Sequence, residues 1–287
     1  MAEITIAGIM RAGAYSPNHI GNDAAIFNAT AEHLRRQGCI VNIYSEEQLI
    51  AGEVKEPIIV NMCREQQSIA LLQQMEKEGR IVVNSGFGIE NCTRERMTRL
   101  LLDNNIPHPE SLIVNTDDTI QEALKKHNFA QCWIKRGDFH AMHKEDVSYA
   151  RHPEEVQGLL QEFALRGISR AVINKHLEGD LVKFYGVQDT PFFYWFYPFD
   201  LGHSKYGHEE INGKSQGLKF DVEKLYQICQ NSSKVLNVMI YGGDCIISPD
   251  GKIRIIDFND WPSFAPCRDD AAPHIAQCIL NHINNCK

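Results

Sequence analysis

The sequence predicts an α/β protein that begins with a Rossmann-like lobe and continues into one or two further lobes. Over residues 1–85 short apolar runs alternate with stretches of helical periodicity, which is typical of a parallel sheet with helices on its faces. Near the C-terminus two apolar runs flank a Pro-Asp-Gly turn, which indicates a β-hairpin. The chain has 287 residues, 43% of them hydrophobic, and is long enough for several hydrophobic cores.

The composition argues against several classes of partner. The formal net charge is −8 and no segment is a basic cluster, so we expect a small-molecule substrate, no nucleic acid and no membrane. No apolar run approaches the roughly 18 residues of a membrane span, and the first residues do not resemble a secretory signal. Nine scattered cysteines without a CxxC pair argue against a zinc site and a disulfide framework. We therefore expect a cytoplasmic protein, and its oligomeric state, a homo-oligomer included, stays open.

The N-terminal lobe is expected to contain four strands and three helices. The strands are predicted at residues 4–9, 39–44, 57–62 and 81–84, and the helices at 23–37, 46–50 and 65–78. No GxGxxG motif follows the first strand, so we assign no dinucleotide. Arg11 lies in the loop after this strand, where open α/β sheets bind ligands. It is a candidate for binding an anionic group of the substrate, and a solvated loop is the alternative.

The elements after residue 85 follow a less regular order. Helices are predicted at 117–127, 153–166, 222–237 and 271–285, and strands at 132–135, 171–177, from 181 onward and at 192–200. In the strand that starts near residue 181, Lys183 shares a face with Leu181 and Tyr185. A lysine on an apolar strand is hard to bury without a charged partner, so this position favours a functional role.

The C-terminal hairpin carries three side chains with oxygen ligands. Because side chains alternate along a strand, Ile255, Asp257 and Asn259 are expected on one face. Asp244 lies near the far end of the partner strand, where an antiparallel return brings it toward the other two. Carboxylate and amide oxygens without His or Cys suit Mg²⁺, which shares its remaining positions with water and substrate phosphates. The alternative is that Asp257 and Asn259 simply end a strand and begin a turn.

The order of Asp244, twelve intervening residues, and Asp257-x-Asn259 resembles the last strands of the ATP-grasp enzymes. Asp257 stands where many members of that superfamily have Glu. The resemblance implies that Asp244, Asp257 and Asn259 hold Mg²⁺ on the phosphates of ATP, with ATP and Mg²⁺ as cofactors. It also implies a two-lobed ATP-grasp domain with a mostly antiparallel sheet after the Rossmann-like lobe. The expected divisions are residues 1–85, 86–180 and 181–287.

Further motifs extend the resemblance over about residues 81–279. Asn84-Ser85, Arg96 and Ile106-Pro107-His108-Pro109 stand where ATP-grasp ligases commonly have Asn-Ser, a helix bearing Asp-Lys and Gly-Ile-Pro-x-Pro. The resemblance therefore assigns ATP phosphate contacts to three cations, namely Arg96, Lys135 and Lys183. It assigns the adenine contacts to the segment made of Asn174, Lys175, His176 and Leu177. Either Asp180 or Glu178 would bind the ribose.

The loop after Lys135 departs from the family pattern. It contains only Gly137, whereas family members usually have several glycines whose backbone N–H groups close over the phosphates. The inositol phosphate kinases, a branch of the same superfamily, also place a histidine in this loop, and His143 is the nearest match. We therefore expect His143, together with Lys183, to be catalytic. The alternative is that His140 and His143 are solvated residues of a polar loop.

The resemblance implies a carboxylate–amine ligase that forms an acyl phosphate and acts on small molecules or peptides. The motifs are similar to those of the branch with the ribosomal-protein glutamate ligase and glutathione synthetase. Many such ligases have an Arg near the aromatic strand; here the nearest cations are Lys205 and Lys214, which we expect to contact the substrate. The alternative is a kinase that phosphorylates a hydroxyl of a polyol or an inositol phosphate, supported by the histidine-bearing loop and the missing Arg. A nucleotide-binding protein without turnover is the third class.

Overall fold

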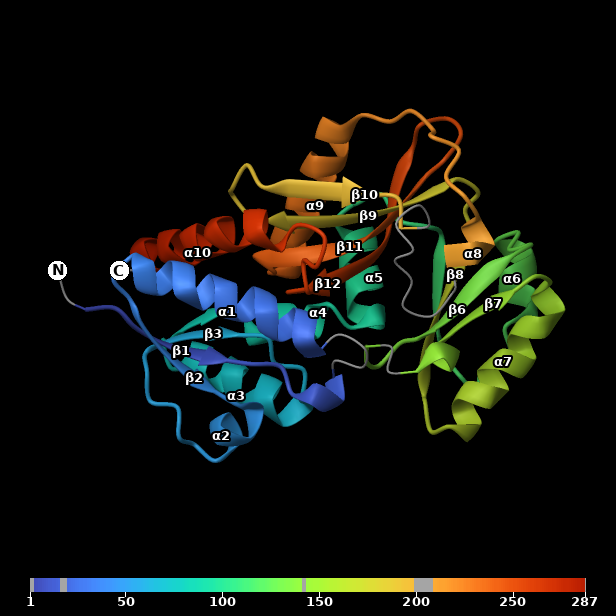
Figure 1. The fold of residues 1–287 in the computed structure, drawn as a ribbon. Helices are drawn as coiled ribbons and strands as arrows, with labels where there is room; N and C mark the ends of the chain where they lie inside the picture. Colours follow the sequence, from blue (N-terminus) through green and yellow to red (C-terminus); the bar gives the residue numbers. More distant parts are fainter. Residues whose placement is uncertain (1–2, 16–19, 141–142, 199–208, 287) are drawn as a thin grey trace.

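The computed structural model describes residues 3–15, 20–140, 143–198 and 209–286, and within them twelve strands form three four-stranded sheets (Figure 1). The first sheet lies in the N-terminal lobe. The second forms a separate body at the opposite end of the molecule, and the third lies between them and contains the C-terminal hairpin. Among the described residues, no helix combines the length and the apolar character that crossing a membrane requires.

The first sheet is parallel and has the strand order β2-β1-β3-β4. Its strands are β1 (Thr5–Ile9), β2 (Ile40–Tyr44), β3 (Ile58–Asn61) and β4 (Ile81–Val83). The helices that follow the first three strands are α1 (Ile20–Arg36), α2 (Glu46–Ile50) and α3 (Gln66–Lys77). The predicted parallel sheet is confirmed. Because the chain places β2 on one side of β1 and β3 on the other, the topological switch point lies between β1 and β3.

The second sheet is antiparallel and has the order β5-β8-β6-β7. Its strands are β5 (Ser111–Asn115), β6 (Cys132–Arg136), β7 (Val147–Ala150) and β8 (Arg170–Lys175), with a short 3-10 helix η2 (Lys144–Asp146) before β7. Helices α6 (Gln121–Lys126) and α7 (Pro153–Leu165) cover one face through a core that includes Leu124, Leu160 and Ile134. Since side chains alternate, Trp133 and Lys135 of β6 project from the other face.

The third sheet is antiparallel and has the order β10-β9-β11-β12. Its strands are β9 (Asp180–Val187), β10 (Phe193–Phe196), β11 (Ile240–Ile247) and β12 (Ile253–Asp260). Helices α5 (Arg94–Asp103) and α9 (Val222–Leu236) pack on one face through a core that includes Met97, Leu101 and Phe258. The predicted hairpin is confirmed, and Gly251 in its turn has a φ of +75°, which glycine adopts without strain.

The last helix, α10 (Arg268–Asn285), lies along α1 (Figure 1). Ile26 of α1 and Ile275 and Ile279 of α10 belong to one hydrophobic core, which also takes in Val60 of β3 and Val187 of β9. The C-terminal helix therefore joins the N-terminal lobe to the third sheet. The predicted divisions at residues 85 and 180 stay a proposal.

The Asn-Ser motif lies between the first and third sheets. The amide nitrogen of Asn84 donates to the carbonyl of Ile240 at 2.8 Å, and its oxygen accepts from the backbone N–H groups of Met239 and Ile240 at 2.9 and 3.0 Å. Ser85 caps the short helix α4 (Gly86–Asn91). This motif therefore attaches β4 to the start of β11. The other short helices are η1 (Gly13–Tyr15) and α8 (Glu209–Asn212).

Candidate active site

Two carboxylates face each other across the C-terminal hairpin. Asp244 of β11 pairs directly with Asp257 of β12, and the next pair is Cys245 with Ile255, so Ile256 is an extra residue in β12. This bulge interrupts the alternation: Ile255 is completely buried in the core, whereas Asp257 is partly exposed. The prediction that Ile255 shares a face with Asp257 is therefore wrong, because strict alternation holds only where no residue is inserted. The expected approach of the two carboxylates is confirmed.

Each carboxylate has its own basic partner from a different element. Lys183 of β9 pairs with Asp244 in the sheet register, and its Nζ lies 2.9 Å from Asp244 Oδ1. Arg94 is the first residue of α5, and its Nη1 lies 2.7 Å from Asp257 Oδ1. A lysine on an apolar strand is hard to bury without a charged partner, and the structure gives Lys183 such a partner in Asp244. The functional role of Lys183 stays a prediction.

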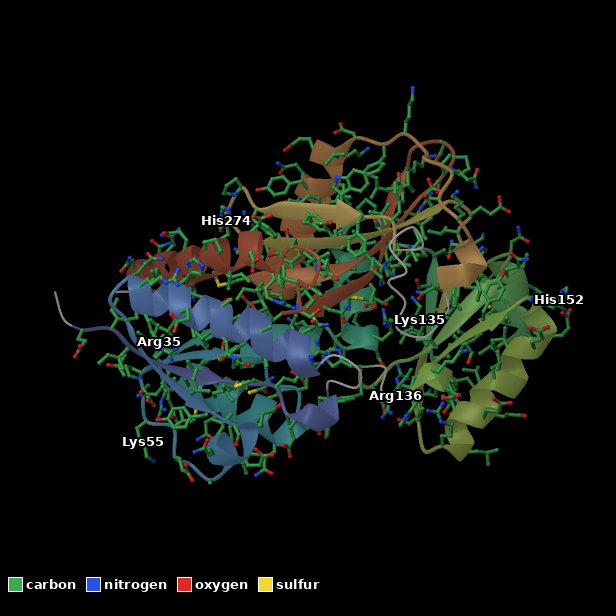
Figure 2. All side chains as sticks on the ribbon, viewed as in Figure 1. Arg35, Lys55, Lys135, Arg136, His152 and His274 are labelled. Carbon is green, nitrogen blue, oxygen red and sulfur yellow. The ribbon has the colours of Figure 1, made fainter. Side chains whose placement is uncertain are left out.

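A third cation reaches the same place from the second sheet. Lys135 projects from β6, is 7% exposed, and donates from Nζ to the carbonyl of Ile256 at 3.1 Å. Arg94 Nη1 also lies 3.3 Å from this carbonyl, which the bulge exposes. Figure 2 shows Lys135 between the sheet that carries β6 and the hairpin of β11 and β12. The two antiparallel sheets therefore meet at a cluster of three cations and two carboxylates.

The cluster shifts the pKa values of its members strongly. Burial, reinforced by the charge of Arg94, lowers the pKa of Lys135 to about 7, although Asp257 and Asp244 oppose this shift. Burial alone would raise the pKa of Asp257, but the charges of Arg94 and Lys135 and hydrogen bonds from Arg94 and Asn259 outweigh it, so this pKa lies below its ordinary range. Asp257 is therefore ionised throughout the physiological range, while Lys135 titrates within it.

The donor set fits Mg²⁺. Asp244 and Asp257 face each other, and the amide of Asn259 lies close enough to hydrogen-bond to Asp257. In the described part of the chain no group of three or more His, Cys, Asp or Glu side chains could hold a metal. A metal at the hairpin would therefore have two carboxylates and one amide from the protein and take its remaining ligands from water and phosphate, as Mg²⁺ commonly does. The metal role of these three residues stays a prediction.

The segment predicted to contact adenine follows β8. The backbone N–H groups of Lys175 and His176 donate within the same lobe, to the carbonyls of Glu110 and Gln131, at 2.9 Å each. Asn174 is buried, and its amide nitrogen donates to a serine hydroxyl of β5. Leu177 is half-buried. Asn174 pairs with Trp133 in the register, so its side chain lies on the face shared with Trp133 and Lys135. Lys175, the next residue of β8, pairs with Cys132 and lies on the opposite face.

Two of the residues predicted to contact ATP or substrate are bound by the protein itself. Asp180 is buried, and its two oxygens accept from the backbone N–H groups of Gln216 and Leu218 at 2.7 and 2.8 Å. Arg11 donates from Nε, Nη1 and Nη2 to Met62, Asp23 and Trp261. Both side chains therefore hold neighbouring parts of the protein in place. All three guanidinium nitrogens of Arg11 are occupied in this way, which does not support its predicted substrate role. Of the two ribose candidates, Glu178 is the exposed one.

Other predicted residues lie away from the cluster. Arg96 is more than half exposed and pairs with Glu90 at 2.9 Å. His143 is exposed, and its backbone N–H donates to Asp146 at 3.0 Å in the 3-10 turn before β7. Lys214 is exposed and has no hydrogen bond or ion pair among the described residues. Lys205 lies outside the described residues.

Sequence reasoning missed three residues near the carboxylates. Arg94 is one, and the signal for it existed: it precedes the buried residues Met97 and Leu101 by three and seven positions, so it shares their helix face. The others are His108, whose pKa burial and the charge of Lys135 lower to about 3, and His140, whose pKa burial and the charge of Arg64 lower well below its ordinary value. His108 occupies the variable position of the Ile-Pro-x-Pro motif, and His140 lies in the loop after Lys135, so neither is singled out by helix or strand periodicity.

Comparisons with solved structures define the fold. D-alanyl-alanine synthetase A from Vibrio cholerae superposes with a TM-score of 0.68 at 12% identity, over 98% of this chain and 99% of that one. The ATP complex of D-alanine–D-alanine ligase from Bacillus anthracis gives a TM-score of 0.66 at 14% identity, over 99% and 96%. The ATP-grasp ligase PsnB with its minimal precursor gives 0.62 at 14% identity, over 98% and 99%. This chain therefore has the two-lobed ATP-grasp fold, with a Rossmann-like lobe before it.

The sequence itself gives no such match. No protein-family model matches it, and no curated protein sequence matches it. Identities of 12–14% establish the architecture only. Any catalytic function therefore depends on the particular side chains of this chain.

Proposed function

We propose that this protein is an ATP- and Mg²⁺-dependent carboxylate–amine ligase of the ATP-grasp type, acting on small molecules or peptides through an acyl phosphate. The observation that carries the proposal is the facing pair Asp244 and Asp257, surrounded by Lys135, Lys183 and Arg94 where two antiparallel sheets meet. Such a site neutralises a polyphosphate and fixes its position, which is the main requirement of phosphoryl transfer.

The residues have distinct tasks in this proposal. Asp244, Asp257 and Asn259 would hold Mg²⁺, which when bound neutralises phosphate oxygens and the charge that develops on them. Lys135 and Lys183 approach from the two sheets that enclose the nucleotide, so each can contact a phosphate without a change of fold. Because Lys135 is almost completely buried, its charge acts in a region of low dielectric constant and is correspondingly effective.

The proposed reaction has two steps. A carboxylate oxygen of the acceptor attacks the γ-phosphorus of ATP, and the bond to the bridging oxygen breaks, so that ADP leaves and an acyl phosphate forms. An amine nitrogen then attacks the acyl carbon and loses a proton, and the bond from that carbon to the phosphate oxygen breaks. The products are an amide, ADP and inorganic phosphate.

The solved neighbours support the choice of ligase and cofactors. One D-alanine–D-alanine ligase structure contains ATP, and PsnB has been solved with a minimal precursor variant, Mg and ADP. PsnB has also been solved with a precursor peptide, which supports peptides as one substrate class. For the present chain these remain parts of the proposal.

The test follows the fate of phosphate. The protein is incubated with ATP, Mg²⁺ and a pool of amino acids, peptides and carboxylates; we expect ADP, free phosphate and a new amide. ADP with a phosphorylated hydroxyl compound and little free phosphate would instead establish the kinase. Nucleotide binding without any product over a broad screen would refute catalysis.

A matched pair of variants tests the metal assignment. Asp257→Asn removes a charged oxygen ligand at almost unchanged volume and should abolish turnover while the melting temperature stays close to that of the parent. Asp250→Asn alters an exposed aspartate in the turn of the same hairpin and should leave turnover unchanged. Full activity of the Asp257 variant would refute the metal site.

A further inference from the structure

A buried glutamate orders two loops at the ligand-binding edge of the first sheet. The carboxylate of Glu46 accepts from the backbone N–H of Ala12 at 2.9 Å, and from those of Arg64 and Glu65 at 3.2 and 3.0 Å. These loops follow β1 and β3, the two strands at the topological switch point of the sheet. Open α/β sheets bind their ligands in the crevice at such a point. The loop that carries Arg64 is therefore fixed where a ligand of this lobe is expected.

Arg64 and Arg11 both lie in this crevice, but they differ in how many of their guanidinium nitrogens have hydrogen-bond partners. All three guanidinium nitrogens of Arg11 donate to protein acceptors. Arg64 Nη2 lies 2.8 Å from Asp260 Oδ1 and 3.2 Å from the carbonyl of Asp260, but its Nε is inaccessible and has no hydrogen-bond partner among the described residues. Both carboxylate oxygens of Asp260 also lack a hydrogen bond of good geometry. The ion pair therefore leaves hydrogen-bonding capacity of Arg64 unused, which is unfavourable in a buried position.

A second unpartnered nitrogen approaches from the loop after β6. His140 Nε2 is inaccessible and has no hydrogen-bond partner in the described part of the chain. Its neighbour Phe139 contacts Tyr15 of the N-terminal lobe, with ring centroids 6.3 Å apart, so this loop rests on the loop that follows β1. The charge of Arg64 is the strongest charge that acts on His140, and that of Asp257 is the next. The loop that carries His140 therefore reaches the crevice beside Tyr15, with Arg64 and Asp257 as nearby charges.

We propose that Arg64 Nε and His140 Nε2 form an anion subsite that binds a carboxylate or phosphate group of the acceptor substrate. A guanidinium is charged at every relevant pH and binds such groups side-on through two N–H donors, and a neutral imidazole can add one more donor. This proposal depends on the proposed function in one respect only: it identifies the bound anion as part of the acceptor substrate. It places that ligand between the N-terminal lobe and the carboxylates Asp244 and Asp257.

Anion titrations of the intact protein test the subsite. Inorganic phosphate and acetate are titrated by calorimetry into protein saturated with Mg²⁺ and the non-hydrolysable analogue AMPPNP, which fills the nucleotide phosphate site. We expect saturable binding of at least one anion, and the tighter of the two identifies the group. Arg64→Gln and His140→Phe should each weaken it roughly tenfold or more, since charge-assisted hydrogen bonds are lost. Arg64→Lys, which keeps a charge beside Asp260 but lacks Nε, should weaken it as well.

The control is Arg80→Gln. Arg80 is also a half-buried arginine of the N-terminal lobe that donates to backbone carbonyls, but it precedes β4 at the opposite edge of the sheet. Anion binding should not change in this variant. No anion binding to the nucleotide-loaded protein, or equal binding by the Arg64 and His140 variants with unchanged melting temperatures, would refute the subsite.

Failure of the proposed function has a different signature. If AMPPNP and Mg²⁺ do not bind, the nucleotide site is refuted, and the same titrations on the free protein still test the subsite. Anion binding that is lost on changing Arg64 would then support it. Anion binding that depends on Lys183 but not on Arg64 would refute it.

Discussion

Arg94 Nη1 lies 2.7 Å from Asp257 Oδ1, so the carboxylate that a metal would use is already paired with a guanidinium. Asp244 is paired in the same way with Lys183. Both facing carboxylates thus have protein cations as partners. Mg²⁺ would compete with these cations for the carboxylates, most directly at Asp244, where Lys183 Nζ lies near both oxygens. A polyphosphate would offer the cations a second partner. Metal and nucleotide are therefore expected to bind together and each to bind weakly alone.

The first prediction compares two arginines of one helix. Arg94→Gln should tighten Mn²⁺ binding to the nucleotide-free protein, by up to about fivefold, because half-buried ion pairs contribute up to about 1 kcal/mol. The same variant should bind AMPPNP more weakly. Arg96→Gln, which alters an exposed residue paired with Glu90, should change neither affinity. Electron paramagnetic resonance of free Mn²⁺ measures the first affinity and calorimetry the second; the opposite ranking of the two variants would contradict this account.

The second prediction concerns the proton of Lys135. With a pKa of about 7 this lysine is mostly neutral at pH 8 in the free protein, and a bound triphosphate should raise its pKa. Nucleotide binding is therefore expected to take up a proton at pH 8 and almost none at pH 6. Calorimetry in buffers of different ionisation enthalpy measures the uptake. Lys135→Met should abolish it, and an unchanged uptake in that variant would assign the proton to another group.

The shifted pKa of Lys135 should also change how the free energy of unfolding depends on pH. Its pKa falls from the ordinary 10.5 to about 7 on folding, so between these values the unfolded chain binds more protons than the folded one. The free energy of unfolding should thus contain a contribution that is least favourable below pH 7 and improves as the pH rises toward 10.5. Urea unfolding at pH 6.5 and pH 9 should show a smaller increase in Lys135→Met than in the parent protein. Equal increases would contradict the assignment.

The third prediction separates the two ribose candidates. Asp180→Ala removes two hydrogen bonds that hold the backbone of Gln216 and Leu218, and should lower the free energy of unfolding by roughly 1–3 kcal/mol. Its effect on nucleotide affinity should be small. Glu178→Gln alters an exposed carboxylate and should weaken nucleotide binding with no loss of stability. Denaturant unfolding and nucleotide titration together test both statements, and the reverse pattern would return the ribose role to Asp180.

The fourth prediction concerns the contact between lobes at Asn84. This buried amide makes three hydrogen bonds to β11 and the residue before it, so Asn84→Ala should lower the free energy of unfolding by roughly 2–4 kcal/mol. Asn91→Ala, which removes one longer bond to Leu236, is the matched control and should cost less than about 1 kcal/mol. Urea denaturation of both variants gives the comparison. Equal losses would mean that Asn84 does not hold the lobes together.

The sequence predicted the parts of the fold that depend on local periodicity. The parallel sheet and the hairpin follow from alternation and turn chemistry, and the structure confirms both. The pairing of Lys183 with Asp244 is a tertiary contact that the sequence did not predict. The face assigned to Ile255 was wrong, because a single inserted residue reverses the alternation and nothing in the local sequence marks it.

The sequence prediction assigned a phosphate contact to Arg96, but the structure brings Arg94 of the same helix to the site. The difference follows from the direction in which each side chain leaves the helix. Residues two apart in a helix are separated by roughly 200° around the helix axis. Arg94 therefore points toward the core side, and Arg96 points to solvent. The family motif led to Arg96, whereas the spacing of Arg94 from Met97 and Leu101 carried the correct information. His140 and His143 lie in a loop without periodicity, so only the tertiary structure distinguishes them.

The pairing of α10 with α1 divides the molecule into a fixed and a movable part. Since the first and third sheets share a single core through this helix pair, they should melt as one cooperative unit. The body formed by the second sheet with α6 and α7 has its own core. It touches the rest where Lys135 and the loop before β5 meet β12, and where Arg170 of β8 pairs with Glu95 of α5. Opening and closing over a nucleotide is therefore expected to be a rotation of this body alone, and that rotation carries Lys135 toward and away from β12.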